Sequence, residues 1–442
     1  PKAPRPRPVV PVPAHDQPLV TIETDPEMPS TSVSLMSKLP HRPDSTGRDY
    51  RRALGERLFN AMLNARLDEI RRQPGAPFLS ASSSSSGFAR AADVFRQSAS
   101  VKEDGVEQGF AALLEEVLRV ERHGFTPTEL ERAKAQILRQ YQQTVKEYDK
   151  RDARGFAAEI VRNFLQDEAM PGPEAELALA ERFLPSYTIA ELNQLGKTLG
   201  AGSRVVAVTG PEKMARPKPE ALLALHKAVL ARDIKPYEDG GAGAALMADK
   251  PAPGPVVKTT TIAEIGVTEW QLKNGVRVVV KPTTFSNDEV RMSAFSPGGH
   301  SLARDVDWDS ARYADAVVNQ GGIGAFDAVK LRKTLAGKVV SVSARIGELD
   351  EGVFGQASPS DLEAMLQLVH LSFTSPRKDG SAFTAWRTRE IESVKNRRLS
   401  PEGTFSEDMQ LFLSQNHPRR RPPTPEVLQK IDWDKAMAFY KD

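Results

Sequence analysis

Apolar residues recur every three to five positions between residues 50 and 70, which is the period of a helix with one buried face. Thr46 and Asp49 stand at capping-box spacing just before this stretch, so we expect the helix to begin there. The preceding stretches LVTIETD and TSVSLMSKLP are rich in residues favoured in strands. The pattern therefore predicts two strands followed by a long helix.

Strands and helices continue to alternate beyond this helix. The stretch PFLSASSSSSGFARAADVFRQSASV predicts two strands around a serine-rich segment, and RVVAVTG predicts a later strand. A second apolar helix face consists of Val106, Phe110, Leu113, Leu114, Val117 and Leu118. Thr126, Pro127 and Glu129 then mark the start of another helix, with the threonine as N-cap and the glutamate completing a capping box. Residues 14–234 are thus expected to form one unit.

The character of the sequence changes between residues 235 and 265, where glycine, alanine and proline dominate and no period holds. This composition is typical of a linker between domains. Beyond it, Asn274-Gly275 between two apolar runs predicts a β-hairpin, and KVVSVSARIG with LDEGVFGQAS predicts a second strand pair. Residues 266–442 are therefore expected to form a second unit. The proline-rich lead-in at 1–13 and the helical pattern at the C-terminus suggest a fragment of a longer chain, with the second unit truncated.

A helix–turn–helix pattern occurs in both units. By position, Leu114, Val117 and Leu118 correspond to Leu362, Met365 and Leu366, and Phe125-Thr126 corresponds to Phe373-Thr374. Either the units are internal repeats, or the likeness is that of any two amphipathic helices joined by a capped turn. We expect two related domains of α+β fold, each a largely antiparallel or mixed sheet with helices packed on one face.

Composition narrows the function classes. The 442 residues carry a formal net charge of +2, which argues against a nucleic-acid binder that depends on a strong basic field. Cysteine is absent, so disulfides, thiol nucleophiles, cysteine-ligated zinc and iron–sulfur clusters are excluded. No apolar run approaches the roughly 20 residues of a membrane-spanning helix.

The richest candidate for chemistry is the stretch SPGGHSLARDVDWDSARYADAVVNQGG, at residues 296–322. It combines His300 with four aspartates, Asp305, Asp307, Asp309 and Asp315. A calcium loop starting at Asp305 needs glycine at its sixth position and glutamate at its twelfth, but Ser310 and Ala316 stand there. The simpler interpretation is that Asp307 or Asp309 caps the following helix.

Histidine spacing argues against a local zinc motif. The seven histidines are His15, His41, His123, His226, His300, His370 and His417, and no two lie within twenty residues of each other. A zinc helix needs two histidines three or four residues apart on one face. The basic stretch HPRRRPP at 417–423 is interpreted as a solvated loop.

Several stretches taken in order carry a resemblance to a known family. They are TDPEMPSTSVSLMSKLP, YRRALGERLFNAMLNARLDEI, LKNGVRVVVKPTTFSNDEVRMSAFSPGGHSL and GQASPSDLEAMLQLVHLSFTSPRKD. Together they resemble the pitrilysin/insulinase-like zinc peptidases, in the bacterial form with two halves and four related domains. The resemblance implies that this chain corresponds to the second and third domains. It also implies that zinc, on an H-x-x-E-H helix, and the catalytic residues lie in parts of the parent outside this chain.

The same resemblance gives the 296–322 stretch a meaning. On the family's H-x-x-E-H motif, Arg312 stands at the first histidine, Asp315 at the glutamate and Ala316 at the second histidine. Neither arginine nor alanine can ligate zinc, so this copy is expected to be degenerate and to hold no catalytic residue, metal or cofactor. Residues 309–319 are expected to form one helix whose apolar side faces the core. Its polar side would face a cleft or solvent, so that Asp315→Ala changes stability by less than about 1 kcal/mol.

Three hypotheses for function follow. The first is a non-catalytic fragment of a zinc metalloendopeptidase, forming chamber wall and hinge, with peptide substrate and the remaining peptidase domains as partners. The second is an inactive pseudo-peptidase that serves an active subunit as a binding or scaffold partner. The third is an unrelated soluble interaction protein. The resemblance implies export of the parent to the periplasm, although this chain carries no signal peptide. Neither a nucleic-acid partner nor a membrane span is expected.

Overall fold

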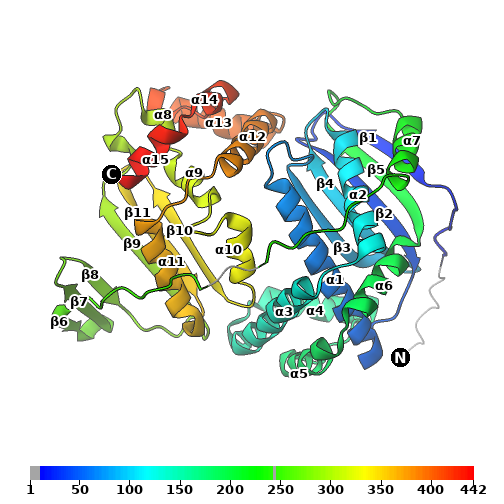
Figure 1. The fold of residues 1–442 in the computed structure, drawn as a ribbon, viewed down its shortest axis with the longest axis horizontal. Coiled ribbons are helices and arrows are strands. Elements are labelled where there is room, and N and C mark those ends of the chain that lie inside the picture. Colours follow the sequence, from blue (N-terminus) through cyan, green and yellow to red (C-terminus); the bar gives the residue numbers. More distant parts are fainter. Residues whose placement is uncertain (1–9, 242–244) are drawn as a thin grey trace, which may run out of the picture.

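The protein is described from a computed structural model that covers residues 10–241 and 245–442. Two groups of elements stand side by side, one from each half of the chain (Figure 1). The first unit, expected at residues 14–234, contains one five-stranded sheet. Its strands are β1 (Leu19–Thr24), β2 (Thr31–Pro40), β3 (Ser80–Ala89), β4 (Ala92–Val101) and β5 (Ser203–Gly210).

The sheet of the first unit is mixed, as the sequence predicts. Its order is β1-β5-β2-β4-β3, with β1 parallel to β5 and every other neighbouring pair antiparallel. The helices are α1 (Gly47–Arg71), α2 (Val106–His123), α3 (Pro127–Lys146), α4 (Ala153–Gln166), α5 (Pro173–Phe183), α6 (Ile189–Gly200) and α7 (Pro219–Leu230). Both predicted capping boxes, at Thr46 and Thr126, are present.

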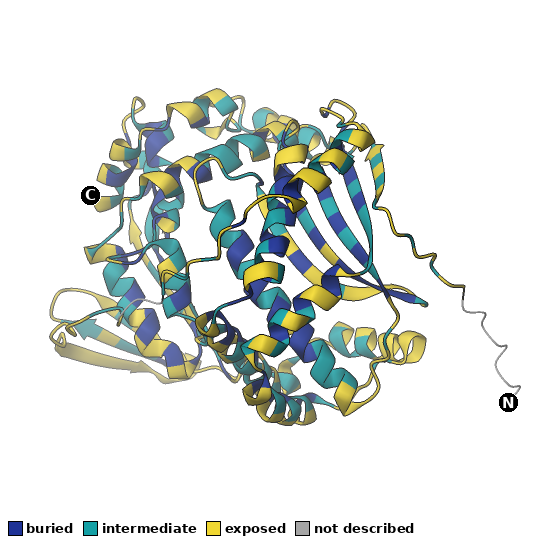
Figure 2. Cartoon of the chain, turned by 45° about the vertical axis from the view of Figure 1, so that its right-hand side comes forward, coloured by how far each residue is buried: buried dark blue, intermediate teal, exposed yellow. Residues whose placement is uncertain are grey.

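Only one face of this sheet is covered by helices. Along β2, Val33 and Leu35 are buried in the main hydrophobic core together with apolar residues of α1 and α2. The residues between them belong to the other face and are partly exposed, which gives the striped strands of Figure 2. On that face Ser32 bonds Thr209 at 2.8 Å between hydroxyl oxygens, and Ser34 bonds Ser98 at 3.0 Å. The uncovered face is therefore polar and rich in hydroxyl groups.

The second unit, residues 266–442, is built on a smaller antiparallel sheet of order β10-β11-β9. These strands are β9 (Val290–Pro297), β10 (Val340–Ile346) and β11 (Asp350–Ala357). The helices are α8 (Trp308–Ala311), α9 (Ala314–Gln320), α10 (Ala328–Thr334), α11 (Leu362–Thr374), α12 (Gly380–Arg397), α13 (Pro401–Leu413), α14 (Pro425–Lys430) and α15 (Trp433–Lys441). Helices α9 and α11 pack on the sheet. Both units thus have the mixed α and β architecture that the sequence predicts.

The two helix–turn–helix segments exist, but their residues do not correspond fully in packing. Leu114 and Leu118 on α2 are buried, whereas Leu362 and Leu366 on α11 are 36% and 50% exposed. Met365 is the member of the second set that lies in the core. The apolar stripe of α11 is therefore rotated relative to that of α2.

The expected linker at 235–265 contains a strand that the sequence pattern does not predict. Residues Val256–Ile262 form β6, which pairs with β7 (Val267–Leu272), and β7 pairs with β8 (Arg277–Val280) through the predicted Asn274-Gly275 turn. Every residue of β6 is exposed, so no apolar period marks it as a strand. This three-stranded sheet stands apart from the main sheet of the second unit (Figure 1).

We expect limited proteolysis to cut first within residues 245–255. These residues are mostly exposed and lie outside the helices and strands. Exposed segments of this kind are cleaved before ordered ones. The fragments can be located by mass spectrometry, and earlier cleavage inside either unit would contradict the proposed boundary.

In residues 10–241 and 245–442, the helices are too short or too polar to cross a lipid bilayer.

Candidate functional site

The helix expected at 309–319 is two short helices, α8 and α9, with a break at Arg312 and Tyr313. The backbone leaves the helix at Tyr313, whose ring packs against that of Trp386 with centroids 5.8 Å apart. The predicted apolar side is nevertheless correct. Ala311, Ala314, Val317 and Val318 are all buried.

The residues aligned with the zinc motif have three different surroundings. Ala316 packs against the apolar cluster that contains Val317 and Trp386. Arg312 lines a pocket, with its guanidinium carbon 4.6 Å from the centroid of the Trp308 ring. Asp315 is turned toward strand β10. They are not gathered around a common point by any contact in the described structure.

The expectation that Asp315 faces a cleft or solvent is wrong. Its carboxylate accepts hydrogen bonds from the backbone N–H of Ile346 at 3.0 Å and of Ala316 at 2.7 Å. One helical turn later, Asn319 donates to the carbonyl of Ala344 at 2.9 Å and accepts from its N–H at 3.1 Å. Because β10 lies at the edge of its sheet, these side chains satisfy backbone groups that a neighbouring strand would otherwise bond. Burial raises the pKa of Asp315.

Asp315→Ala is accordingly expected to lower the free energy of unfolding by about 1–3 kcal/mol, since it leaves backbone donors of β10 and α9 unsatisfied. Urea titration measures the change. Asp309→Ala is the control, because Asp309 makes no hydrogen bond or ion pair within the described residues; its effect should stay within about 0.5 kcal/mol. Equal effects of the two substitutions would show that the contacts of Asp315 to β10 contribute nothing.

The aspartate cluster before α8 forms ion pairs. Asp307 occupies the N-cap position, but its side chain caps no backbone N–H, so the expected cap is not made. Its carboxylate pairs instead with Arg304 and, at 2.7 Å, with Lys435. Asp305 pairs with Arg419 at 2.5 Å. In the described part of the chain, no three His, Cys, Asp or Glu side chains gather in a way that could hold a metal ion.

We expect the chain to retain no tightly bound zinc. Arg312 and Ala316 provide no ligand, and the one carboxylate of the aligned motif, that of Asp315, already bonds backbone N–H groups. The protein can be treated with a chelator, exposed to zinc, passed through a desalting column and assayed for metal. Zinc recovered in a stoichiometric amount would contradict this expectation.

A cavity of about 470 Å³ surrounds Arg312 and is called the arginine pocket below. Its lining residues are His300, Ser301, Trp308, Arg312, Tyr313, Glu348, Gln410, Arg419, Arg420 and Arg421.

The interpretation of HPRRRPP as a solvated loop is wrong for its first arginine. Arg419 donates to the carbonyl oxygens of Ser301 and Ala303 at 3.2 and 2.8 Å, which fixes the loop after β9. Burial lowers the pKa of His300.

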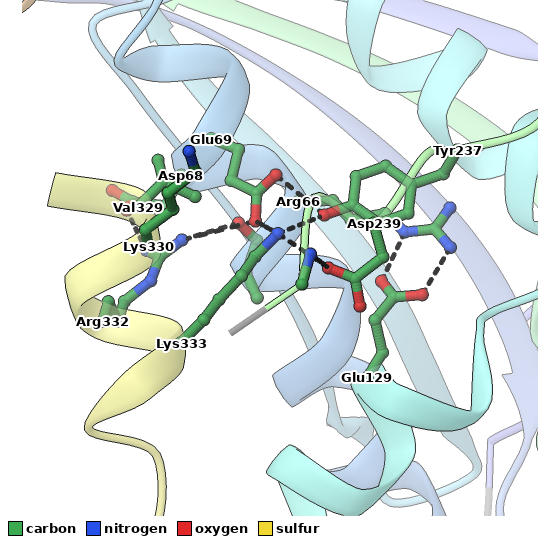
Figure 3. Close-up of polar contacts among 12 residues, drawn as sticks. Arg66, Asp68, Glu69, Glu129, Tyr237, Asp239, Val329, Lys330, Arg332 and Lys333 are labelled. Carbon is green, nitrogen blue, oxygen red and sulfur yellow. Dashed lines mark hydrogen bonds and ion pairs between the residues drawn. The ribbon is translucent and has the colours of Figure 1, made fainter. Parts of the chain in front are cut away.

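A second cluster of charged groups joins the two units, and we call it the inter-unit network (Figure 3). Its members are Asp68 and Glu69 of α1, Tyr237 and Asp239 after α7, and Arg332 and Lys333 of α10. The ammonium group of Lys333 lies 2.9 Å from the Tyr237 hydroxyl, 2.9 Å from Asp239 and 3.1 Å from Glu69. Arg332 pairs with Asp68. The segment expected to be a free linker thus supplies two side chains to this contact.

The network holds its acidic and basic groups in their charged forms. Burial opposes charge at Asp68, but hydrogen bonds from Arg72 and Arg71 and the charge of Arg332 outweigh it and set the pKa at about 2. Asp239 also has a lowered pKa, since hydrogen bonds from Thr128 and Lys333 outweigh its burial. Lys333 is only 8% exposed, yet its pKa is raised because its partners outweigh burial.

The inter-unit network continues into the core of the first unit through Arg66. Arg66 is 2% exposed, and its guanidinium bonds the carboxylate of Glu129 through two nitrogens, at 2.7 and 2.8 Å. A further nitrogen lies 3.2 Å from Glu116. The guanidinium carbon lies 4.2 Å from the centroid of the Tyr237 ring, so the tyrosine links this ion cluster to Lys333.

The fold just described is a pair of mixed α and β units. Residues 1–137 match the family model described as the Peptidase M16 inactive domain. A zinc protease PQQL-like protein of Arabidopsis thaliana is 25% identical over 444 residues, covering 98% of this chain and 40% of that protein. The probable zinc protease PqqL of Escherichia coli strain K12 is 22% identical over 312 residues, covering 70% of this chain and 33% of that protein. These matches confirm the resemblance to the pitrilysin/insulinase-like zinc peptidases.

A solved structure supports the fold. A mutant of the ferredoxin protease FusC, in complex with Arabidopsis ferredoxin, superposes with a TM-score of 0.60 at 19% identity, covering 98% of this chain and 49% of that chain. At this identity the likeness concerns the fold alone. The chain spans less than half the length of the curated relatives that it matches.

Proposed function

We propose that this chain is the non-catalytic part of a zinc metalloendopeptidase, in which it forms wall and hinge of a chamber that encloses peptide substrates. The match of residues 1–137 to an M16 inactive domain carries this proposal. The identity of Arg312 and Ala316, where the family's motif has histidines, supports it. In this proposal zinc and its ligands belong to another part of the parent, and residues 14–234 and 266–442 correspond to its second and third domains.

The polar face of the five-stranded sheet suits the role of a wall. Ser32, Ser34, Ser98 and Thr209 place hydroxyl groups on the face that helices leave uncovered. A wall of small polar side chains lets an unfolded peptide move along it, because it offers little apolar surface to hold the peptide. The inter-unit network suits the role of a hinge, since it fixes α10 on α1 (Figure 3). A second contact between the units joins Asp288 to Arg139 and Lys146 of α3.

The test uses the gene sequence on both sides of this chain. The longer protein is expected to carry H-x-x-E-H before the present Pro1 and to hydrolyse an unstructured peptide, with loss of activity after chelation and recovery with zinc. The chain by itself should be inactive under the same conditions. A longer protein without the motif and without hydrolysis would overturn the proposal and support an inactive scaffold subunit.

A further inference from the structure

The arginine pocket carries positive charge that the described residues do not neutralise. Four arginines line it, against one glutamate. Two of the arginines have carboxylate partners, in the ion pairs Arg419–Asp305 and Arg420–Glu348. Neither Arg312 nor Arg421 forms an ion pair within residues 10–241 and 245–442. Two guanidinium groups are therefore available to an anion from outside.

Trp308 arranges these groups. The guanidinium carbons of Arg312 and Arg419 lie 4.6 and 5.9 Å from the centroid of its ring, and His300 stands edge-on to the ring at 5.9 Å. Trp308 is 7% exposed, yet its indole N–H has no hydrogen-bond partner in the described part of the chain. A buried donor without a partner is costly in a native structure, and the residue that carries it also lines the pocket.

The geometry suits a carboxylate. The Arg312 guanidinium has five N–H donors, of which one is directed to the hydroxyl of Tyr313 at 3.0 Å. Planar guanidinium groups bind carboxylates through two parallel hydrogen bonds. Ser301, Tyr313 and Gln410 add neutral polar groups to the lining, which are the partners that a peptide backbone uses. The volume of about 470 Å³ has room for a few residues of a peptide.

We propose that the arginine pocket binds a carboxylate group of an acidic peptide, with Arg312 and Arg421 as its ionic partners. The peptide nature of the ligand rests on the proposed function. If Arg312 stands at the first histidine of the family's motif, as the resemblance implies, the degenerate copy would retain contact with the peptide after losing the chemistry.

Isothermal titration calorimetry on the whole chain tests the proposal. The probes are a short glutamate-rich peptide, the same peptide with glutamine in place of glutamate, a form of the acidic peptide with an amidated C-terminus, and inorganic phosphate. The acidic peptide should bind, and added salt should weaken the binding. The glutamine peptide should bind far more weakly. The amidated form distinguishes a side-chain carboxylate, which it keeps, from a C-terminal carboxylate, which it lacks.

Three variants locate the site. Arg312→Gln and Arg421→Gln should each weaken binding of the acidic peptide about tenfold or more, as expected for loss of one charge-assisted contact. Arg277→Gln is the matched control, because Arg277 is an exposed arginine on β8 with only a distant carboxylate at 3.8 Å. It should bind like the unchanged chain. Arg421 is exposed, so its substitution keeps the fold even if Arg312→Gln does not.

Several outcomes would overturn the proposal. They are no binding of the acidic peptide, equal binding of the glutamine peptide, equal loss with Arg277→Gln, and binding of phosphate without binding of peptide. The result is independent of the hydrolysis test above. If the peptide binds here and the longer protein proves inactive, the pocket stands and the peptidase role falls.

Discussion

Replacing Arg66 with alanine is expected to lower the free energy of unfolding by about 3–5 kcal/mol, the usual cost of removing one partner from a buried ion pair. Arg66 is 2% exposed, and its guanidinium is the direct partner of Glu129 and Glu116, which are themselves 5% and 3% exposed. Without it the Glu129 carboxylate keeps its bonds to Thr126, and Glu116 keeps that to Arg119. Much of the negative charge at this point would still be buried without compensation.

Chemical denaturation followed by circular dichroism measures this loss. Arg51→Ala is the control, because Arg51 lies on α1 like Arg66 and also bonds a glutamate, Glu191 of α6, through two nitrogens. The side chains of Arg51 and Glu191 are 33% and 39% exposed. The substitution should cost less than about 1 kcal/mol, as exposed ion pairs do. If the two substitutions proved equally mild, the Arg66 cluster would not hold α1 onto α2 and α3. Arg66→Met, which fills the space without the charge, should be about as harmful as Arg66→Ala if charge is the cause.

The sequence carried a signal for this cluster that was not used. Met62, Arg66 and Ile70 stand four residues apart, so a periodic interpretation of α1 puts the arginine within the buried stripe. A charge in such a place needs a partner. Its partner was visible as the glutamate of the predicted capping box at Thr126. What the sequence could not provide is that Glu129 bonds both the Thr126 N–H, at 2.7 Å, and a guanidinium 63 residues earlier in the chain.

Elements with a local cause were predictable, and those that depend on distant partners were not. The Asn274-Gly275 hairpin and the capping boxes are formed as expected, because each is set by a few neighbouring residues. Strand β6 has no buried residue, so only its pairing with β7 makes it a strand. Glycine and alanine around residue 240 suggested a free linker, although Tyr237 and Asp239 beside them are bound to α10.

The candidate site shows the same division. The apolar side of residues 311–318 follows from spacing alone, and the structure buries it as predicted. The polar side follows from spacing only in part. Arg312 lines a pocket and Asn319 is exposed, as expected, but a helix wheel cannot tell solvent from the open edge of a strand. Asp315 and Asn319 face that edge, where β10 offers backbone N–H groups. The same limit applies to Arg419, whose place in the arginine pocket depends on carbonyl oxygens more than a hundred residues away.

Lys333→Met is expected to lower the free energy of unfolding by about 3 kcal/mol and to weaken the coupling between the two units at α1. Methionine keeps the length of the side chain but removes the charge that Asp239 and Glu69 share. Asp239 retains Arg132 at 2.8 Å, so the first unit itself should stay folded. The second unit loses its most buried link to α1. The contacts of Asp288 with Arg139 and Lys146 remain. The denaturant transition of the second unit should therefore move to lower concentration than that of the first.

Lys330→Met is the matched control for this prediction. Lys330 lies on the same helix, one turn earlier, but its side chain is 52% exposed and its nearest carboxylate, that of Asp327, is 3.9 Å away. This variant should unfold like the unchanged chain. Tryptophan fluorescence reports the second unit in particular, since all four tryptophans lie beyond residue 265, whereas circular dichroism reports both units. Coincident transitions by the two probes in Lys333→Met would mean that the ion pairs of Asp288 with Arg139 and Lys146 hold the units together without the inter-unit network. A hinge at this place would then have to rest on other contacts, because α10 approaches α1 through the residues of this network.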